Sequence, residues 1–215
     1  LQEKSMLEIL LSGRLALPPV EPSGGYAFFV GGLQSGSVRS DYTDKYTYAD
    51  NTIVPGTTLL ATRYRGAMCG NAVVAIYGGG TQTGTVATTE KYTFGTQSFA
   101  GGTVLPAGRA YLRAASNMTQ GLFVGGVGST RADMYFYADD TTGTGQAMTA
   151  VRYNGAAAGN AEVAVFAQGH NGSVTLATSV VYTHATVTRV NGTTLSQQTQ
   201  GSLGVGDASH ALFGA

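Results

Sequence analysis

Residues 75–80 read Ala75-Ile76-Tyr77-Gly78-Gly79-Gly80, a short apolar run that ends in glycines, and this pattern recurs along the chain. The other copies are FFVGG at 28–32, LFVGG at 122–126, VFAQG at 165–169 and ALFGA at 211–215. Gly32, Gly80, Gly126 and Gly169 follow one another at intervals of 48, 46 and 43 residues. A period of this length indicates a repeat protein in which each copy is one supersecondary unit.

Two further landmarks keep the same spacing. An arginine lies sixteen residues before the first position of the doublet: Arg63 before Gly79, Arg109 before Gly125, and Arg152 before Gln168. After each doublet come a polar loop and a segment rich in Tyr and Thr, at 44–48 (DKYTY), 90–94 (EKYTF), 133–137 (DMYFY) and 180–183 (VVYT). Because three landmarks agree over four periods, we assign a structural role in the repeat to Arg63, Arg109, Arg152, Gly31, Gly32, Gly79, Gly80, Gly125 and Gly126.

Each copy predicts four antiparallel strands. The strand after the arginine is built from small residues, and the next is an apolar run that does not alternate, as expected of a strand buried on both faces. The glycine doublet allows positive φ and close backbone approach. Two outer strands rich in Thr and Tyr follow. The dipeptides Asn154-Gly155, Asn171-Gly172 and Asn191-Gly192 predict hairpin turns.

These units resemble the kelch repeat family, in which an apolar strand, a Gly-Gly doublet, a polar loop and a Glu-x-Tyr-like strand recur over about 50 residues. The resemblance covers residues 26–215 and implies an all-β fold, a kelch-like β-propeller of four to five blades with four antiparallel strands per repeat of about 45 residues. The sequence departs from the family in having no Trp, and in Gln168-Gly169 as its fourth doublet. Its last apolar run has no outer strands behind it. Either this run completes the ring with N-terminal strands, giving four or five blades, or a neighbouring subunit supplies the missing edge, and an unpaired edge favours assembly.

The sequence before the repeats predicts a separate segment. Residues 1–17 are expected to form a short amphipathic helix with Ser5 and Glu8 as a capping box. Residues 18–25, rich in Pro and Gly, are expected to be a linker to the propeller domain at 26–215. The apolar side chains of the helix need a surface to pack on, either the chain's own β-domain or a partner subunit, unless the segment is a processing remnant. The candidate partner anchor consists of Leu7, Ile9, Leu10 and Leu11.

Composition excludes several classes of function. Lys plus Arg and Asp plus Glu are 12 each, so the net charge is zero, and charged residues are only 11% of the chain. Nucleic-acid binding, which needs clustered basic residues, is not expected. No apolar run approaches the roughly 18 residues that span a bilayer, so we expect no membrane span. The single cysteine, Cys69, allows no internal disulfide.

A search for catalytic groups favours a protein that is not an enzyme and carries no cofactor or metal. His170, His184 and His210 lack metal-ligand spacing. Cys69 lies on an expected inner strand and is interpreted as a core residue rather than a nucleophile. The three repeated arginines resemble a sialidase-type triad, but one per repeat is the pattern of a structural residue.

The Gly- and Thr-rich, charge-poor composition resembles that of bacteriophage virion components. The resemblance implies a tail, fibre, baseplate or capsid-decoration protein, assembled in the host cytoplasm and bound to other virion proteins in a symmetric assembly. A cellular kelch-type interaction module is the alternative, and a degenerate propeller enzyme is a minor one. Loops after the apolar strands are expected to meet on one face of the ring and to contact a host glycan, a receptor or another subunit. The candidate contact residues are Gln34, Gln82, Arg131, His170 and Asn171.

Overall fold

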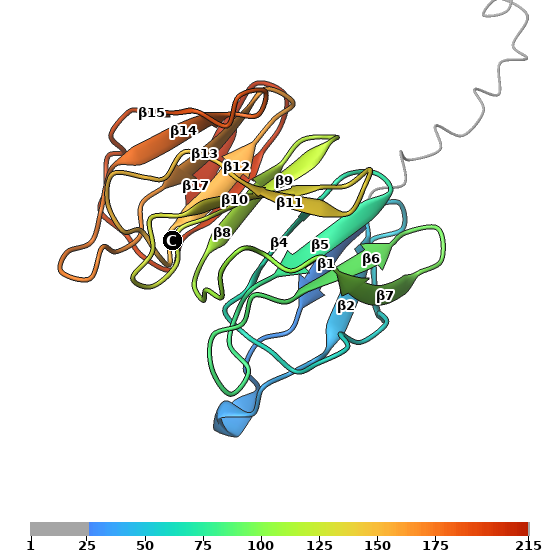
Figure 1. Cartoon of the computed structure of the whole chain (residues 1–215). Helices are drawn as coiled ribbons and strands as arrows, with labels where there is room; N and C mark the ends of the chain where they lie inside the picture. The colour runs from blue at the N-terminus through green and yellow to red at the C-terminus, as the bar shows by residue number, and fades with distance from the viewer. Residues whose placement is uncertain (1–25, 215) are drawn as a thin grey trace, which may run out of the picture. The chain divides into compact units, whose positions relative to one another are not determined.

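The computed structural model describes residues 26–214, which form an all-β structure of small antiparallel sheets (Figure 1). The all-β class is therefore confirmed. Within residues 26–214 the only helical turn is η1 (Ser35–Ser37), and no helix there is long and apolar enough to cross a membrane. The helix predicted for 1–17, with Leu7, Ile9, Leu10 and Leu11, and the linker at 18–25 lie outside the described residues.

The chain divides into two compact units. The first contains a three-stranded antiparallel sheet in the order β1-β2-β3, with β1 at Tyr26–Val30, β2 at Thr43–Thr47 and β3 at Thr52–Pro55. Its β2–β3 turn is closed by Asp50, whose carboxylate accepts hydrogen bonds from the backbone N–H and the hydroxyl of Thr52. Asn51 takes a positive φ of 55° in the same turn, as Asn does more readily than most residues.

The second unit, residues 31–42 and 57–214, holds three four-stranded sheets and one two-stranded sheet. Each sheet is a meander in which every strand pairs with its neighbour in sequence, so one repeat makes one sheet. The first consists of β4 (Ala67–Gly70), β5 (Val74–Gly78), β6 (Thr89–Thr93) and β7 (Ser98–Gly102). The second consists of β8 (Arg113–Ser116), β9 (Gln120–Val124), β10 (Ala132–Phe136) and β11 (Thr141–Thr144). The third consists of β12 (Ala156–Gly159), β13 (Val163–Ala167), β14 (Ser179–Thr183) and β15 (Arg189–Asn191), and the last of β16 (Leu203–Gly206) and β17 (Ala211–Gly214).

The core of the second unit lies between successive sheets. Every residue of β5 and β9 is buried, as the absence of alternation in these strands predicts. One apolar cluster joins the first and second sheets around Ile76, Phe123 and Tyr135, and another joins the second and third around Leu122 and Phe166. Gly78 makes room for this stacking, because a Cβ there would lie 2.9 Å from the ring of Phe123.

In the second unit, the turns between the first and second strands of each sheet are closed by a repeated side chain. Asn71, Asn117 and Asn160 each accept hydrogen bonds from the first N–H of the following strand and from the N–H just before it, and Asp207 accepts from the two N–H groups that precede β17. The prediction of hairpin turns at the Asn-Gly dipeptides is confirmed for Asn171-Gly172, which turns the chain between the bridged residues His170 and Thr175 in the β13–β14 connection. It is wrong for the other two, because Asn154 precedes β12 and Asn191 ends β15. The turns between the first and second strands are Asx turns instead, because the side-chain oxygen of the Asn or Asp accepts the N–H groups that would otherwise need a backbone acceptor.

Candidate functional site

The repeated arginines are buried beside the loop that follows each glycine doublet. Arg63 is 2% exposed, Arg109 3% and Arg152 8%. Arg63 donates from Nη1 to the carbonyl oxygens of Gly79 (3.3 Å) and Thr88 (3.0 Å). Arg109 donates from Nη1 to Gly125 (2.7 Å) and Arg131 (3.1 Å), and Arg152 donates to Gln168 and to Thr178 (2.9 Å). The arginine therefore fixes the same loop in all three repeats.

In two repeats the same guanidinium also forms a buried ion pair. Arg63 pairs with Glu90, and Arg109 pairs with Asp133 at 2.5 Å. The second oxygen of Glu90 accepts the backbone N–H of Leu60 at 2.6 Å. Each carboxylate is thus held by two donors, which offsets the cost of burying its charge.

We number the repeats of Arg63, Arg109 and Arg152 first to third, after the sheets that they form, and the third repeat lacks this carboxylate. Strand register places Glu90 opposite Tyr77, Asp133 opposite Phe123 and Val180 opposite Phe166, so valine occupies the position of the two acids. The Nη2 of Arg152 donates instead to the Thr178 hydroxyl at 2.7 Å. Among residues 26–214, no carboxylate forms an ion pair with Arg152.

Burial without a counter-ion lowers the pKa of Arg152 to about 10. The pKa of Arg109 is also lowered by burial, but there the negative charge of Asp133 acts in the opposite direction. At neutral pH Arg152 therefore remains a cation inside the protein, without the neutralising partner that its two equivalents have.

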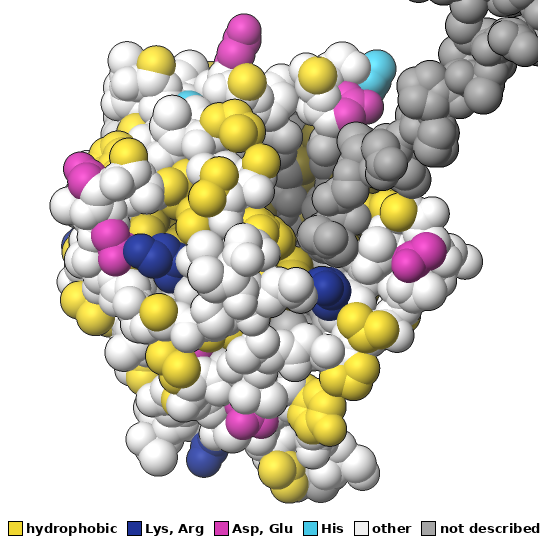
Figure 2. Space-filling model, turned by 90° about the vertical axis from the view of Figure 1, so that its right-hand side faces the viewer, with side chains coloured by type: hydrophobic (Ala, Val, Ile, Leu, Met, Phe, Trp, Pro, Cys, Tyr) yellow, Lys and Arg dark blue, Asp and Glu magenta, His cyan; other side chains and the backbone are white. Residues whose placement is uncertain are grey.

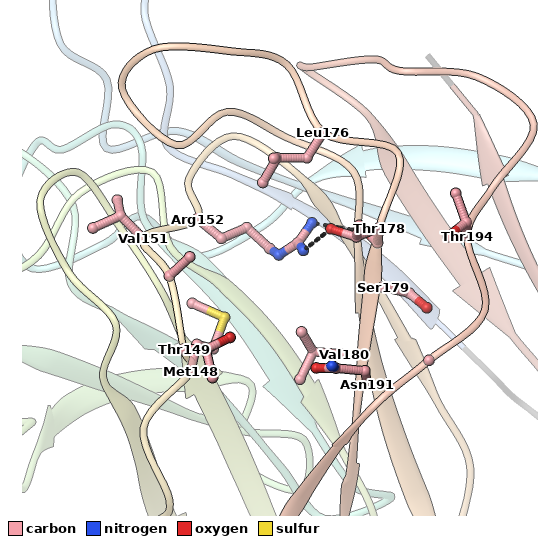
Figure 3. Close-up of a pocket in the computed structure, with 12 residues that line it drawn as sticks. Met148, Thr149, Val151, Arg152, Leu176, Thr178, Ser179, Val180, Asn191 and Thr194 are labelled. Atoms are coloured by element: carbon pink, nitrogen blue, oxygen red, sulfur yellow. Dashed lines mark hydrogen bonds between the residues drawn. The ribbon is translucent and has the colours of Figure 1, made fainter.

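A cavity of about 320 Å³ lies beside Arg152 (Figure 3). Its walls come from the loop before β12, the start of β14 with the loop before it, and the end of β15 with the segment after it. The Arg152 side chain extends across it to Thr178, with Leu176 on one side and Met148 and Val180 on the other (Figure 3). The cavity lies entirely within the second unit.

The glycine doublets connect each repeat to the next. Gly31, Gly79 and Gly125 have φ between 64° and 74°, and Gln168 adopts the same conformation with a φ of 57°. The second residue of each doublet donates its N–H across to the following repeat: Gly32 to Arg63, Gly80 to Arg109, Gly126 to Arg152, and Gly169 to Thr199. Gln168 therefore keeps the backbone geometry of the doublet despite its side chain.

The five loop residues proposed as contacts are held by their own surroundings. Gln34 reaches Ser40 at 3.5 Å, Arg131 pairs with Asp133 at 3.0 Å, and the His170 ring hydrogen-bonds Tyr153 at 3.0 Å. The backbone N–H of Gln82 donates to Gly84, and Asn171 caps its own turn. Within residues 26–214, no hydrogen bond or ion pair joins two of these five side chains.

A row of rings that was not predicted from the sequence follows the repeated arginines. The Arg65 guanidinium lies 4.3 Å from the ring centroids of both Tyr64 and Tyr111. The Tyr111 ring is 6.1 Å from Tyr153, which is 5.4 Å from His170. The sequence contains a pattern that could have predicted this row, because Tyr64, Tyr111 and Tyr153 lie one or two positions after Arg63, Arg109 and Arg152.

Cys69 is half-buried and His184 is buried. Burial raises the pKa of Cys69 to about 12, and the Tyr137 hydroxyl lies 3.8 Å from its sulfur. A thiol with this pKa is protonated at neutral pH and is a poor nucleophile. Burial lowers the pKa of His184, which is 4% exposed. The described residues hold no cluster of three His, Cys, Asp or Glu side chains that could bind a metal ion.

Small antiparallel meander sheets that stack in chain order make this a β-propeller-like repeat protein. The chain is similar to a solved structure of YjhT, with a TM-score of 0.68 and 12% sequence identity over 84% of this chain and 71% of that one. At this identity the similarity concerns the fold alone. No protein-family model and no curated protein sequence matches the chain.

Proposed function

We propose that the protein is a non-enzymatic assembly component, a bacteriophage virion structural protein whose repeats form a kelch-like propeller of four to five blades. It acts by geometry, through surfaces that join it to neighbouring subunits. The observation that carries the proposal is a face of the β16–β17 sheet that no other sheet of the second unit covers.

This face is aliphatic and exposed. Leu203 and Val205 alternate along β16 and so share one side, and Leu212 lies opposite Val205 in the register. They are 76%, 66% and 71% exposed. A hollow of about 590 Å³ lies over these side chains and the intervening glycines. The other side of the sheet packs on β12, where a Cβ at Gly204 would overlap the backbone of Ala157.

Stacking of the sheets indicates what covers such a face. The second sheet covers the first, the third covers the second, and β16–β17 covers the third. Each repeat therefore buries its apolar face against a sheet of the same kind, as repeat proteins do. The complementary surface for β16–β17 is another such sheet, either the β1–β2–β3 sheet of the same chain or a sheet of a second copy. We assign it to a second copy of this chain in a symmetric assembly.

The charge distribution agrees with a role in assembly. On the face shown in Figure 2, charged side chains are few and stand apart between uncharged polar and hydrophobic surface. The buried arginines and their carboxylates stabilise the fold and are not presented to solvent. The virion class itself is supported by the composition, with 11% charged residues and 32 glycines.

The oligomeric state tests the proposed interface. The triple variant Leu203→Thr, Val205→Thr and Leu212→Thr should convert a concentration-dependent oligomer to a monomer in sedimentation velocity. The matched control replaces Leu60, Val73 and Val104, which are 62%, 61% and 54% exposed, by Thr and should leave assembly unchanged. A wild-type protein that is monomeric at all concentrations contradicts the interface.

The virion assignment has its own test. Mass spectrometry of purified phage particles should find the protein at a fixed copy number, and deleting residues 1–20, with the proposed anchor, should reduce its incorporation. A protein that is absent from particles and monomeric in the cell would instead be the cellular interaction module considered above.

A further inference from the structure

We propose that the cavity beside Arg152 binds a small monocarboxylate, whose carboxylate occupies the position that Glu90 and Asp133 fill in the two preceding repeats. The proposal concerns a ligand site inside the third sheet, and it does not depend on the assembly interface proposed above.

The first repeat shows how a carboxylate is held at this position. One oxygen of Glu90 accepts from Arg63 Nη2, and the other accepts from the backbone N–H of Leu60. Leu60 lies three residues before Arg63, and Thr149 lies three residues before Arg152. The residues just before these two, Leu59 and Met148, are also equivalent. Each donates its backbone N–H to a carbonyl oxygen in the loop before the outer strands of the preceding repeat. The third repeat therefore keeps the two donors of the carboxylate site, Arg152 and the Thr149 N–H.

The third repeat has no carboxylate side chain equivalent to Glu90 and Asp133 at the position where the cavity opens. Val180 stands at the register position of Glu90 and Asp133, and it lines the cavity together with Thr149 and Arg152. A buried guanidinium without a counter-ion is unfavourable, and a carboxylate that forms charge-assisted hydrogen bonds with it relieves that cost. Burial lowers the pKa of Arg152 only to about 10, so the side chain carries its charge at neutral pH.

The lining determines the class of ligand. Arg152 is the one charged residue among the residues that line the cavity, which matches a single negative charge on the ligand. Aliphatic walls are provided by Met148, Val151, Leu176 and Val180, and polar groups by Ser179, Asn191 and Thr194. A volume of about 320 Å³ is at the lower end of the range for small-molecule sites. These features fit a short organic acid with one carboxylate.

Titration of the whole chain with propionate tests the site. In ¹⁵N–¹H spectra, the backbone amides of Thr149 and Thr178 should shift with a saturable dependence on propionate. Sodium chloride and sodium sulfate at the same ionic strength should not reproduce these shifts, which separates a carboxylate site from a general response to anions. Absence of saturation, or equal shifts with chloride, overturns the proposal.

The variant Val180→Glu introduces the carboxylate that the first repeat has, and this side chain should compete with the ligand for Arg152. We expect it to weaken propionate binding about tenfold or more, because the ligand loses charged hydrogen bonds to Arg152. Val190→Glu adds the same charge on the same sheet at a side chain that is 65% exposed, and it should leave binding unchanged. If Val180→Glu does not fold, Val180→Asp reproduces the second repeat and serves the same purpose. A folded variant of either kind that binds propionate like the wild type contradicts the assignment.

Discussion

Gly80 donates its backbone N–H to the carbonyl oxygen of Arg109 over 2.7 Å, so the glycine doublet of one repeat is hydrogen-bonded to the arginine of the next. The same arginine fixes the doublet loop of its own repeat through its side chain. One residue therefore stabilises two repeats, through its backbone toward the preceding one and through its guanidinium within its own.

Replacing Gly79 by Ala should destabilise the protein strongly. A Cβ there would lie 2.7 Å from the Arg109 carbonyl oxygen, at a φ of +67°. We expect a loss of about 3 kcal/mol, the combined cost of a left-handed conformation and overpacking. Urea denaturation measures it. Gly84→Ala, where a Cβ has open space, should change stability by less than about 0.5 kcal/mol, and similar losses for both variants would contradict the close-approach argument.

Removing the buried carboxylate of the second repeat should be similarly costly. Asp133→Asn leaves Arg109 and Arg131 without their acid, and breaking a buried pair in this way costs about 3–5 kcal/mol. The control is Asp140→Asn, which removes the partly exposed pair with Lys91 and should cost at most about 1 kcal/mol. Thermal and chemical denaturation of both variants provide the comparison, and equal costs would argue against a structural role for the buried pair.

Gln168→Gly should stabilise the protein. Gln168 adopts a φ of 57° at a position where the other doublets have glycine, and its side-chain oxygen is buried without a hydrogen-bond partner among the described residues. We expect a gain of about 1 kcal/mol, the penalty for a left-handed non-glycine residue. Gln82→Gly, in the loop after Gly79-Gly80, should give no gain because Gln82 does not have a positive φ. A loss of stability on Gln168→Gly would show that its side chain contributes more than the backbone strain costs.

Stability should fall in mild acid because of His184. Burial lowers its pKa below the ordinary value of about 6.5, so the unfolded chain takes up a proton at a higher pH than the folded protein does. The contribution is complete above the unfolded pKa and is lost as the pH decreases from about 6.5 toward the folded value. His184→Gln should flatten the dependence of unfolding free energy on pH in this window.

The sequence predicts those features that depend on neighbouring residues. The apolar runs at β5 and β9 and the glycines after them determine a buried strand and a left-handed turn locally, and both are found. The same reasoning treats Gln168 as a degraded copy, because side-chain type alone does not reveal that the backbone keeps its φ.

Features that depend on strand register were not predicted. The alignment of EKYTF, DMYFY and VVYT contains the replacement of Glu90 and Asp133 by Val180, but only the fold shows that this position faces the repeated arginine. The Asx turns at Asn71, Asn117 and Asn160 follow the repeat period too. Their second role, donating Nδ2–H to the carbonyl of Met118, Ala161 or Ala208 in the next repeat, requires the stacked sheets.

The hydrogen bonds from each doublet to the following repeat all run in one direction along the chain. Their acceptors are synthesised after their donors: Arg63 after Gly32, Arg109 after Gly80, Arg152 after Gly126 and Thr199 after Gly169. During translation, a repeat that has left the ribosome is therefore completed only when the acceptor residue of the following repeat emerges. The same polarity makes the two ends unequal. Loss of a repeat at the C-terminal end strands a buried donor in the repeat before it, whereas loss at the N-terminal end frees only a carbonyl oxygen, which tolerates the lack of a partner more readily.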